Sequence, residues 1–362
     1  MNVAFLSDQT LPHTYERVRS IELLNNNVFF ISWPIKGEEM NDNLLYLPYP
    51  RSLKKLFFLV PNLIVLSFIL FKNKIEILHI MGIASWPYGI VSKVSKTKYI
   101  IEHNGSDILV EPKKMPILKW FYKIAYLFSN GVVQDSAVSK RAGINYGAPK
   151  NNNKIIDIGV DFSVFNSKLK KGFIRKKYNL SNNTKIVLCP RGFKKIYNNN
   201  IILKALLIIK SKIQSVIFIF CGYYDQKNDL LEFVDRYDLK ENVVFAGMLN
   251  RYNELPLYYS DADVVVSIPS SDSSPLSVYE AMACMTPVVV STLPWLYHNF
   301  SDCMPINVNY NDDKLLADKI YNLLGDPASS KTEEIYKIVN TKINLTYEGV
   351  KLMDLYNKVV NK

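Results

Sequence analysis

The 362-residue sequence lacks the features that mark several protein classes. Its four cysteines, Cys189, Cys221, Cys284 and Cys303, stand far apart, which excludes zinc knuckles and CxxC redox motifs. All four lie in apolar or strand-like stretches, so we expect buried, reduced thiols and a cytoplasmic location. The four histidines form no cluster with carboxylates at metal-ligand spacing, so no metal site is expected. No basic segment precedes Asp8, so the N-terminus does not resemble a signal peptide.

Long apolar runs are scarce as well. The longest, Leu56 to Phe71, reads LFFLVPNLIVLSFILF and is flanked by lysines. A membrane-spanning helix needs about 20 apolar residues, and Pro61 interrupts this shorter run. We therefore expect a buried or interfacial helix rather than a membrane span.

Positive charge is abundant and unevenly distributed. The chain has a formal net charge of +11, and residues 51–154 alone hold 16 Lys and Arg against 5 Asp and Glu. Such a region attracts anionic lipid head groups, pyrophosphate-linked acceptors or nucleic acid, unless its lysines simply cover solvated helix faces. No known DNA- or RNA-binding motif occurs, so we expect no nucleic-acid partner.

Apolar runs of strand length alternate with helical patterns, which is typical of a parallel sheet wound with helices. The first series has strands at 3–7, 28–32, 75–80, 98–103 and 131–134, and helices at 14–25, 56–71, 89–95 and 113–129. A polar, turn-rich break at 148–155 predicts a linker that ends before Asn182. The second series has strands at 185–189, 216–221, 243–245, 264–268 and 288–291, helices at 199–212, 230–237, 255–260 and 275–284, and a final helix at 346–360.

The segment 264–291, VVVSIPSSDSSPLSVYEAMACMTPVVVS, is the most informative. A buried strand ends near Pro269, and Pro275 suits the first position of a helix that Ser273 or Ser274 caps. A helix that begins beyond a strand's carboxyl end presents free N–H groups and a positive dipole end, which suits a diphosphate. Glu280 lies eight residues after Asp272. The two carboxylates are therefore spaced to meet hydroxyl groups along an extended nucleotide sugar.

This segment resembles the donor-binding signature of GT-B glycosyltransferases of the family-four type. In that family an acid, seven intervening residues and a Glu precede an Ala-Met-Ala stretch and a Pro-Val-Val strand. The resemblance implies that Glu280 binds the ribose hydroxyls and that Asp272 contacts the transferred sugar. It also implies that backbone N–H groups of Ser274, Leu276 and Ser277, beside Ser273 and Pro275, face the phosphates. Met285 departs from the family, which usually has Gly there, and this puts the local turn in question.

A second match follows the strand at 185–189. In the family an Arg and a Lys five residues later neutralise the leaving diphosphate; Arg191 fits the first role. The Lys position falls on Ile196, so Lys195 or Lys194 substitutes or the role is empty. Further likeness covers most of the chain, including Ile156–Phe165, which resembles the family's hinge region, and Tyr258–Asp263.

The N-terminal half matches the family more loosely. The family often has paired glycines after its first strand, but this loop, 9–15, has none, and Arg17 or Arg19 is a candidate to compensate. His103 and Asp107 follow a predicted strand end, where ligands bind in such sheets, so we expect them to line the sugar site. His79 is expected to close a core strand.

The sequence therefore predicts an α/β GT-B fold with two Rossmann-like domains. We expect residues 1–165 to bind the acceptor, 166–345 to bind the nucleotide sugar, and 346–362 to form a helix that crosses back. The expected activity is metal-independent, retaining transfer of a hexose from a UDP-, GDP- or ADP-sugar to a saccharide or lipid-linked saccharide. The predicted catalytic residues are Arg191, Lys195, Asp272, Glu280 and His103; the predicted donor-binding residues are Ser273, Ser274, Pro275, Leu276, Ser277, Lys194 and Asp107.

The resemblance places this activity in surface polysaccharide or lipopolysaccharide assembly, with no cofactor besides the donor. The basic aromatic helix at 113–128 favours peripheral contact with the inner face of the cell membrane through 51–154. Alternatives are a nucleotide-sugar epimerase of the same fold and a non-catalytic sugar or nucleic-acid binder. Asp261-Ala262-Asp263 spells the metal-binding DxD of the other major glycosyltransferase fold, but its place before a buried strand argues against that role.

Overall fold

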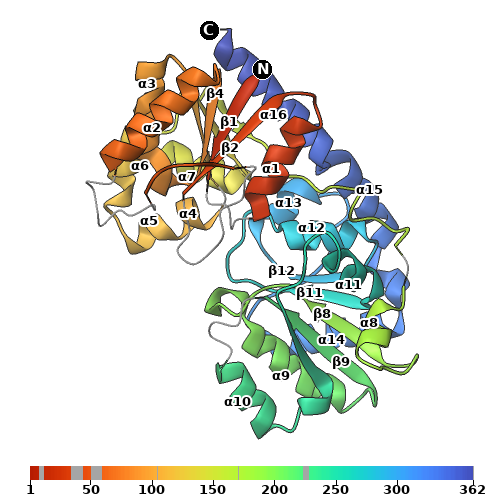
Figure 1. Cartoon of the computed structure of the whole chain (residues 1–362). Coiled ribbons are helices and arrows are strands. Elements are labelled where there is room, and N and C mark those ends of the chain that lie inside the picture. The colour runs from red at the N-terminus through yellow and green to blue at the C-terminus, as the bar shows by residue number, and fades with distance from the viewer. Residues whose placement is uncertain are drawn as a thin grey trace. The chain divides into compact units, whose positions relative to one another are not determined.

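The computed structural model describes residues 1–7, 12–33, 44–49, 59–103, 105–169, 171–222 and 228–361. They form two compact units: unit 1 contains Met1–Gly159 and Leu345–Lys362, and unit 2 contains Val160–Asn344. The chain thus enters unit 2 once and returns to unit 1 for its last helix (Figure 1). The loop at 9–11, residues 56–58 of the predicted helix at 56–71, and residues 51–58 of the basic region lie outside the described residues.

Unit 1 is built on a seven-stranded parallel sheet in the order β3-β2-β1-β4-β5-β6-β7. The strands are β1 (Asn2–Leu6), β2 (Asn27–Ser32), β3 (Leu45–Tyr46), β4 (Ile77–Met81), β5 (Lys98–His103), β6 (Gly131–Gln134) and β7 (Asn153–Ile155). The helices are α1 (Pro12–Glu22), α2 (Leu59–Lys72), the 3-10 helix η2 (Ile83–Ile90), α3 (Val91–Ser95), α4 (Ser106–Leu109), α5 (Glu111–Lys114), α6 (Leu118–Phe128), α7 (Ala137–Asn145) and α16 (Leu345–Val360).

Alternate residues of each strand serve the two faces of this sheet. Ala4 and Leu6 join the core under α2, α3 and α6, whereas Val3 and Phe5 join the core under α1 and α16. This follows from the period of two in a strand, and near-continuous apolar strands are what a sheet covered on both faces requires. Figure 1 shows α2, α3 and α6 on one side of the sheet and α1 and α16 on the other.

Unit 2 repeats the plan with a six-stranded parallel sheet in the order β10-β9-β8-β11-β12-β13. The strands are β8 (Lys185–Cys189), β9 (Val216–Cys221), β10 (Val243–Gly247), β11 (Val264–Ser267), β12 (Val288–Ser291) and β13 (Ile306–Val308). The α-helices are α8 (Phe173–Lys177), α9 (Asn199–Lys210), α10 (Asn228–Arg236), α11 (Leu255–Asp261), α12 (Leu276–Ala283), α13 (Pro294–Asn299), α14 (Asp313–Gly325) and α15 (Thr332–Lys342).

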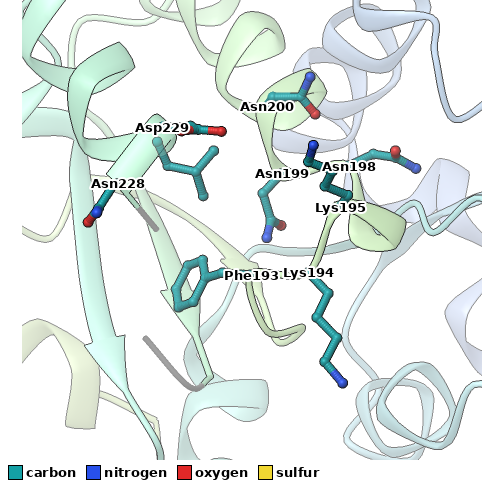
Figure 2. A pocket seen from close by; sticks show the side chains of 9 residues that line it. Phe193, Lys194, Lys195, Asn198, Asn199, Asn200, Asn228 and Asp229 are labelled. Atoms are coloured by element: carbon teal, nitrogen blue, oxygen red, sulfur yellow. The ribbon is translucent and has the colours of Figure 1, made fainter. Parts of the chain in front are cut away.

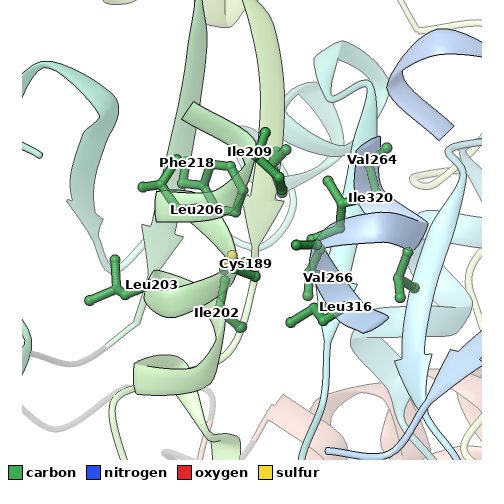
Figure 3. Close-up of a cluster of buried hydrophobic side chains, with 14 of the residues drawn as sticks. Cys189, Ile202, Leu203, Leu206, Ile209, Phe218, Val264, Val266, Leu316 and Ile320 are labelled. Atoms are coloured by element: carbon green, nitrogen blue, oxygen red, sulfur yellow. The ribbon is translucent and has the colours of Figure 1, made fainter. Parts of the chain in front are cut away.

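One face of the second sheet packs against α9 and α14. Leu206 and Ile209 of α9 meet Leu316 and Ile320 of α14 over Val266 of β11 (Figure 3). Cys189, Cys221 and Cys284 are buried free thiols, and burial raises the pKa of Cys221 to about 12. Cys303 is only half-buried, so the expectation of buried thiols was wrong for this residue.

The predicted α/β fold class is confirmed, with local corrections. β7 lies inside the predicted linker, because a polar edge strand carries little hydrophobic signal. The single helix expected at 113–129 is α5 and α6, separated by Met115–Ile117, since the residue before Pro116 disfavours helical geometry. β3, β13 and the helices α4, α7, α8, α13, α14 and α15 were not predicted. Within the described ranges, no helix combines the length and apolarity needed to cross a membrane.

Candidate functional site

The predicted basic and acidic residues of unit 2 meet where its strand order reverses. β8 and β11 are neighbours in the sheet although β9 and β10 lie between them in sequence. Arg191 follows β8 and Asp272 follows β11, so both stand beyond the carboxyl ends of the two strands. In open parallel sheets this switch point is where ligands bind.

Arg191 is anchored on three sides. One terminal nitrogen, Nη2, lies 2.9 Å from Asp272 Oδ2, and Nη1 donates to Ser277 Oγ over 3.1 Å. The guanidinium carbon lies 4.6 Å from the centre of the Tyr197 ring. Burial opposes the charge of Arg191, but the Asp272 carboxylate outweighs it, and the pKa of Arg191 is raised. Asp272 therefore keeps Arg191 protonated, and Ser277 holds the guanidinium at the first turn of α12.

Glu280 is a buried carboxylate with a partner on each oxygen. Its side chain is 1% exposed; Arg251 Nη2 contacts Oε1, and the Tyr259 hydroxyl donates to Oε2 over 3.1 Å. The Arg251 guanidinium lies 5.4 Å from the Phe165 ring centre. Arg251 and Tyr259 thus hold this buried carboxylate in a defined position.

The start of α12 differs from the sequence expectation in two details. The helix begins at Leu276, and Pro275 occupies the N-cap position, which makes no side-chain cap hydrogen bond. The expected capping by Ser273 or Ser274 is therefore wrong. The Leu276 N–H donates to Ser274 O over 3.0 Å, and Asp272 Oδ1 accepts from the Ser273 N–H over 2.9 Å. In this structure two N–H groups of the turn thus have protein acceptors.

The end of α12 explains why Gly is usual where this chain has Met285. Met285 has a φ of 58°, in the left-handed region, and its N–H donates to Met282 O over 3.0 Å. The Thr286 N–H donates to Ala281 O over 3.0 Å. These bonds form a Schellman motif, whose left-handed position favours Gly. The turn is therefore retained with a residue that adopts it at a cost.

Lys194 and Lys195 are exposed and line a cavity of about 630 Å³ (Figure 2). The opposite rim includes Asn228 and Asp229 at the start of α10. Asn198 Nδ2 donates to Ile268 O over 2.8 Å and so ties the loop after β8 to the end of β11. The two lysines thus belong to the loop that carries Arg191, on its solvent side.

The predicted N-terminal site residues His103 and Asp107 contact each other and other residues of unit 1. His103 is fully buried, with Nδ1 3.0 Å from Asp107 Oδ2 and Nε2 3.0 Å from the Tyr126 hydroxyl. Asp107 is partly exposed, so a ligand of this unit would meet Asp107 before His103. The idea that Arg17 compensates for the missing glycines was wrong, because Arg17 is buried against Glu102.

The DxD-like pair also has a structural role. Asp261 accepts from the N–H groups of Gly172 (2.5 Å) and Ile174 (2.6 Å), at the start of α8. Asp263 Oδ2 accepts from the Ile186 N–H over 2.7 Å. Both carboxylates are thus committed to backbone donors. Among the described residues, no group of three or more His, Cys, Asp or Glu side chains is arranged to hold a metal ion.

Sequence reasoning missed Arg251, Tyr259 and Tyr197. Their spacing to Asp272 and Glu280 carries no pattern, because the folded loops bring them together from different elements. The one available signal was an arginine within the asparagine-flanked, turn-forming stretch 250–253.

Two family models match the chain. Residues 170–338 match "Glycosyl transferases group 1", and residues 2–136 match "Glycosyl transferase 4-like". The alpha-monoglucosyldiacylglycerol synthase of Streptococcus pneumoniae is 26% identical over 46% of this chain and 38% of its own length. The O-antigen chain mannosyltransferase RfbU of Salmonella typhimurium is 32% identical over 30% of each chain. The matches thus span well under half of either curated relative.

Several solved structures share the whole architecture. HepE of Anabaena, solved with UDP and glucose, superposes with a TM-score of 0.78 at 15% identity, over 99% of this chain and 100% of that one. A glycosyltransferase of Rickettsia africae gives a TM-score of 0.81 at 17% identity, over 99% and 98%. At these identities the likeness establishes the fold, which is GT-B.

Proposed function

Because the chain belongs to the GT-B glycosyltransferases of the family-four type, we propose that it moves a sugar from a nucleotide-diphosphate sugar to a saccharide or lipid-linked saccharide. The donor is a UDP-, GDP- or ADP-linked hexose held by unit 2. The acceptor is bound by unit 1, with Asp107 and, behind it, His103 near the transferred sugar. No cofactor besides the donor takes part.

The buried Glu280 carries this proposal. Burial of a carboxylate is costly unless donors satisfy it, and Arg251 and Tyr259 are among the donors to Glu280. A carboxylate held in this way is suited to accept the vicinal hydroxyls of a ribose, which is the role that the family resemblance implies for Glu280. Arg191 stands at the first turn of α12, through Ser277, where a diphosphate finds both its charge and the helix dipole.

Stabilisation of the leaving diphosphate is the main catalytic task. Breakage of the anomeric C–O bond leaves negative charge on the phosphate oxygen while the sugar becomes oxocarbenium-like. Arg191, with Lys195 or Lys194 on the same loop, supplies positive charge without a divalent metal. When the donor binds, the Asp272 carboxylate gives up part of its contact with Arg191 and accepts hydrogen bonds from the sugar hydroxyls instead. The anomeric configuration is retained, with the leaving phosphate accepting the acceptor's proton.

The named relatives support a role in glycolipid or surface polysaccharide assembly. One is a glucosyldiacylglycerol synthase and the other an O-antigen chain mannosyltransferase. The first name describes a glycolipid of diacylglycerol, and the second describes an O-antigen chain. We infer a lipid or lipid-linked saccharide as the acceptor of this chain. An acceptor of this kind would bring the protein to the cytoplasmic face of the cell membrane.

Nucleotide release from a panel of UDP-, GDP- and ADP-sugars tests the proposal, with membrane extract as acceptor and with and without chelator. We expect release that depends on one donor and on acceptor, persists with chelator, and is lost in Glu280→Ala. Glu241→Ala, at an exposed site on the same unit, is the matched control.

Loss of activity with chelator would overturn metal independence, and an inverted product would overturn retention. Interconversion of the donor without transfer would instead indicate an epimerase, and no donor binding by calorimetry would overturn the proposal.

A further inference from the structure

The outer faces of α2, α3 and α6 expose large apolar side chains. Phe68 (62%) and Phe71 (79%) of α2 are joined by Val94 (79%) of α3 and by Trp120 (64%) and Leu127 (79%) of α6. Isolated exposed apolar residues are ordinary, but a group of this size on adjoining helices marks an interaction surface. We call the exposed side of these three helices the α2–α3–α6 face.

The three helices form one continuous layer of unit 1. α3 packs against α2 and against η2, and α6 packs against η2 and β5. Their inner sides share one hydrophobic core, to which Leu66, Val91 and Tyr122 contribute. In α2, Val60, Ile64 and Phe68 recur every fourth residue, so they form a stripe along one side of the helix.

Only positive charge accompanies this apolar surface. Each of the three helices carries lysine and none carries Asp or Glu. Lys72 Nζ lies 5.9 Å from the centre of the Phe68 ring, and Lys123 Nζ lies 5.3 Å from that of Trp120. A lysine stem beside an exposed aromatic ring can lie along an apolar surface while its ammonium group reaches water or a phosphate.

We propose that the α2–α3–α6 face docks onto a membrane surface that contains anionic lipids, with its apolar side chains entering the head-group region. Anionic head groups complement the lysines, and acyl chains accept the rings and aliphatic groups. A second copy of this face would set lysines against lysines, which argues against self-association. α2 has 14 residues, so it lies at the interface and does not span. The proposal concerns unit 1 and stands apart from donor binding by unit 2.

Sedimentation with lipid vesicles tests the proposal on the full chain. Wild-type protein should sediment with phosphatidylglycerol vesicles and not with phosphatidylcholine vesicles, and 0.5 M salt should release it. The quadruple variant Phe68→Ser, Phe71→Ser, Trp120→Ser, Leu127→Ser should lower the partition coefficient at least tenfold. Each of Lys72→Gln and Lys123→Gln should lower it by roughly fivefold, as expected for one lysine at an anionic surface.

Leu23→Ser with Val350→Ser is the matched control. Both residues are exposed and belong to the opposite side of the same sheet, so this variant should bind vesicles like wild type. Unchanged hydrogen-exchange protection of β1 and β4 in every variant would show that the fold of unit 1 is intact. Equal binding by the quadruple variant, or no binding by wild type, would overturn the proposal. A concentration-dependent dimer that the quadruple variant abolishes would mean that a second copy covers the face.

Discussion

At the residue scale, the geometry of Glu280 depends on Arg251 and Tyr259. Arg251→Gln leaves the buried carboxylate without its charged partner, so the carboxylate is reoriented or protonated. We expect donor affinity to fall by ~10- to 100-fold, in keeping with the loss of a charge-assisted hydrogen bond of about 1.5–3 kcal/mol. Tyr259→Phe removes a neutral hydrogen-bond donor and should weaken binding of the nucleotide by about 1 kcal/mol. Calorimetric titration with the preferred nucleotide measures both.

Arg236→Gln provides the control for Arg251→Gln, because Arg236 is an exposed arginine at the end of α10. It should bind donor like wild type. If Arg251→Gln also binds donor normally, Glu280 is oriented without Arg251 or does not contact the ribose. A rise in KM with little change in kcat would assign Arg251 to donor binding alone.

Met285 makes a separate prediction about stability. A left-handed backbone costs an L-residue other than Gly or Asn about 1–2 kcal/mol, and more for a β-branched side chain. Met285→Gly should therefore be neutral or stabilise unit 2 by up to about 1 kcal/mol, since the flexibility gained by the unfolded chain offsets part of the gain. Met285→Val should destabilise it by about 1–2 kcal/mol. Urea unfolding measures the stability of both variants, and a Met285→Val variant as stable as Met285→Gly would contradict backbone strain at this position.

Some residues of the site can be predicted from the sequence around them, whereas the role of others depends on contacts between distant parts of the chain. Arg191, Asp272 and Ser277 lie beyond strands whose apolar runs are unmistakable, and the structure brings them together. Arg17 was a candidate to compensate for the missing glycines, yet it is buried with Nε 3.0 Å from Glu102 Oε2. Glu102 lies 85 positions away in sequence. A contact at that separation depends on the sheet order, which no local pattern reveals.

At the element scale, α16 is joined to the sheet of unit 1 by buried polar groups. The Tyr356 hydroxyl lies 2.5 Å from His79 Nδ1, and His79 Nε2 lies 2.9 Å from Glu102 Oε2. Burial lowers the pKa of His79. Burial opposes ionisation of Glu102, but Arg17 and His79 outweigh it and hold the pKa at about 2. The position of α16 on the sheet of unit 1 is therefore fixed by buried polar contacts as well as by apolar packing.

Glu348 of α16 makes the stability of unit 1 depend on pH. Burial, reinforced by the nearby Asp157 carboxylate, raises the pKa of Glu348 from 4.5 to about 7. Between these values the folded protein keeps a proton that the unfolded chain has lost, so the contribution of Glu348 to stability falls as pH rises from about 4.5 to 7 and levels off above. That loss is at most about 3 kcal/mol. Glu102 acts only below pH 4.5, whereas the lowered pKa of His79 makes stability rise with pH up to about 6.5 and so opposes the effect of Glu348.

Glu348→Gln isolates this effect. An amide keeps an oxygen to accept from the Asp157 N–H, which donates to Glu348 Oε2 over 2.9 Å, but it cannot ionise. We expect the Tm of the variant to gain on that of wild type as pH rises from 5 to 8 and to exceed it at pH 8, while His79 affects both proteins alike. Glu333→Gln, at an exposed position in unit 2, should leave the profile unchanged. Parallel profiles for wild type and Glu348→Gln would show that Glu348 does not titrate in this range.

At the scale of the whole molecule, the sequence predicted two α/β units and the final helix, because strongly periodic segments dominate both. It placed the unit boundaries at 165 and 345, whereas the structure divides the chain after Gly159 and after Asn344. Val160 N–H donates to Ile343 O over 2.8 Å, so the outgoing and returning segments lie side by side in unit 2. This pairing joins segments that are far apart in sequence, so no local periodicity reveals where the chain leaves and re-enters unit 1.

The return of the chain to unit 1 depends on the close approach of α16 to α1. A Cβ atom on Gly349 would lie 2.5 Å from the carbonyl oxygen of Ser20, and a backbone atom cannot yield as a side chain does. Gly349→Ala must therefore push α16 away from a core that includes Leu352 and Tyr356. We expect a loss of about 1–3 kcal/mol from unit 1 despite the better helix propensity of Ala. Gly325→Ala, at the end of α14 with open space around it, should leave unit 2 unchanged or slightly stabilised.

Because each unit has its own core, hydrogen exchange should show faster opening in β1, β4 and α16 of Gly349→Ala while β8 and β11 keep their protection. Equal loosening of both units would mean that they unfold as one cooperative body, and normal protection throughout would mean that α1 shifts to accommodate the methyl group.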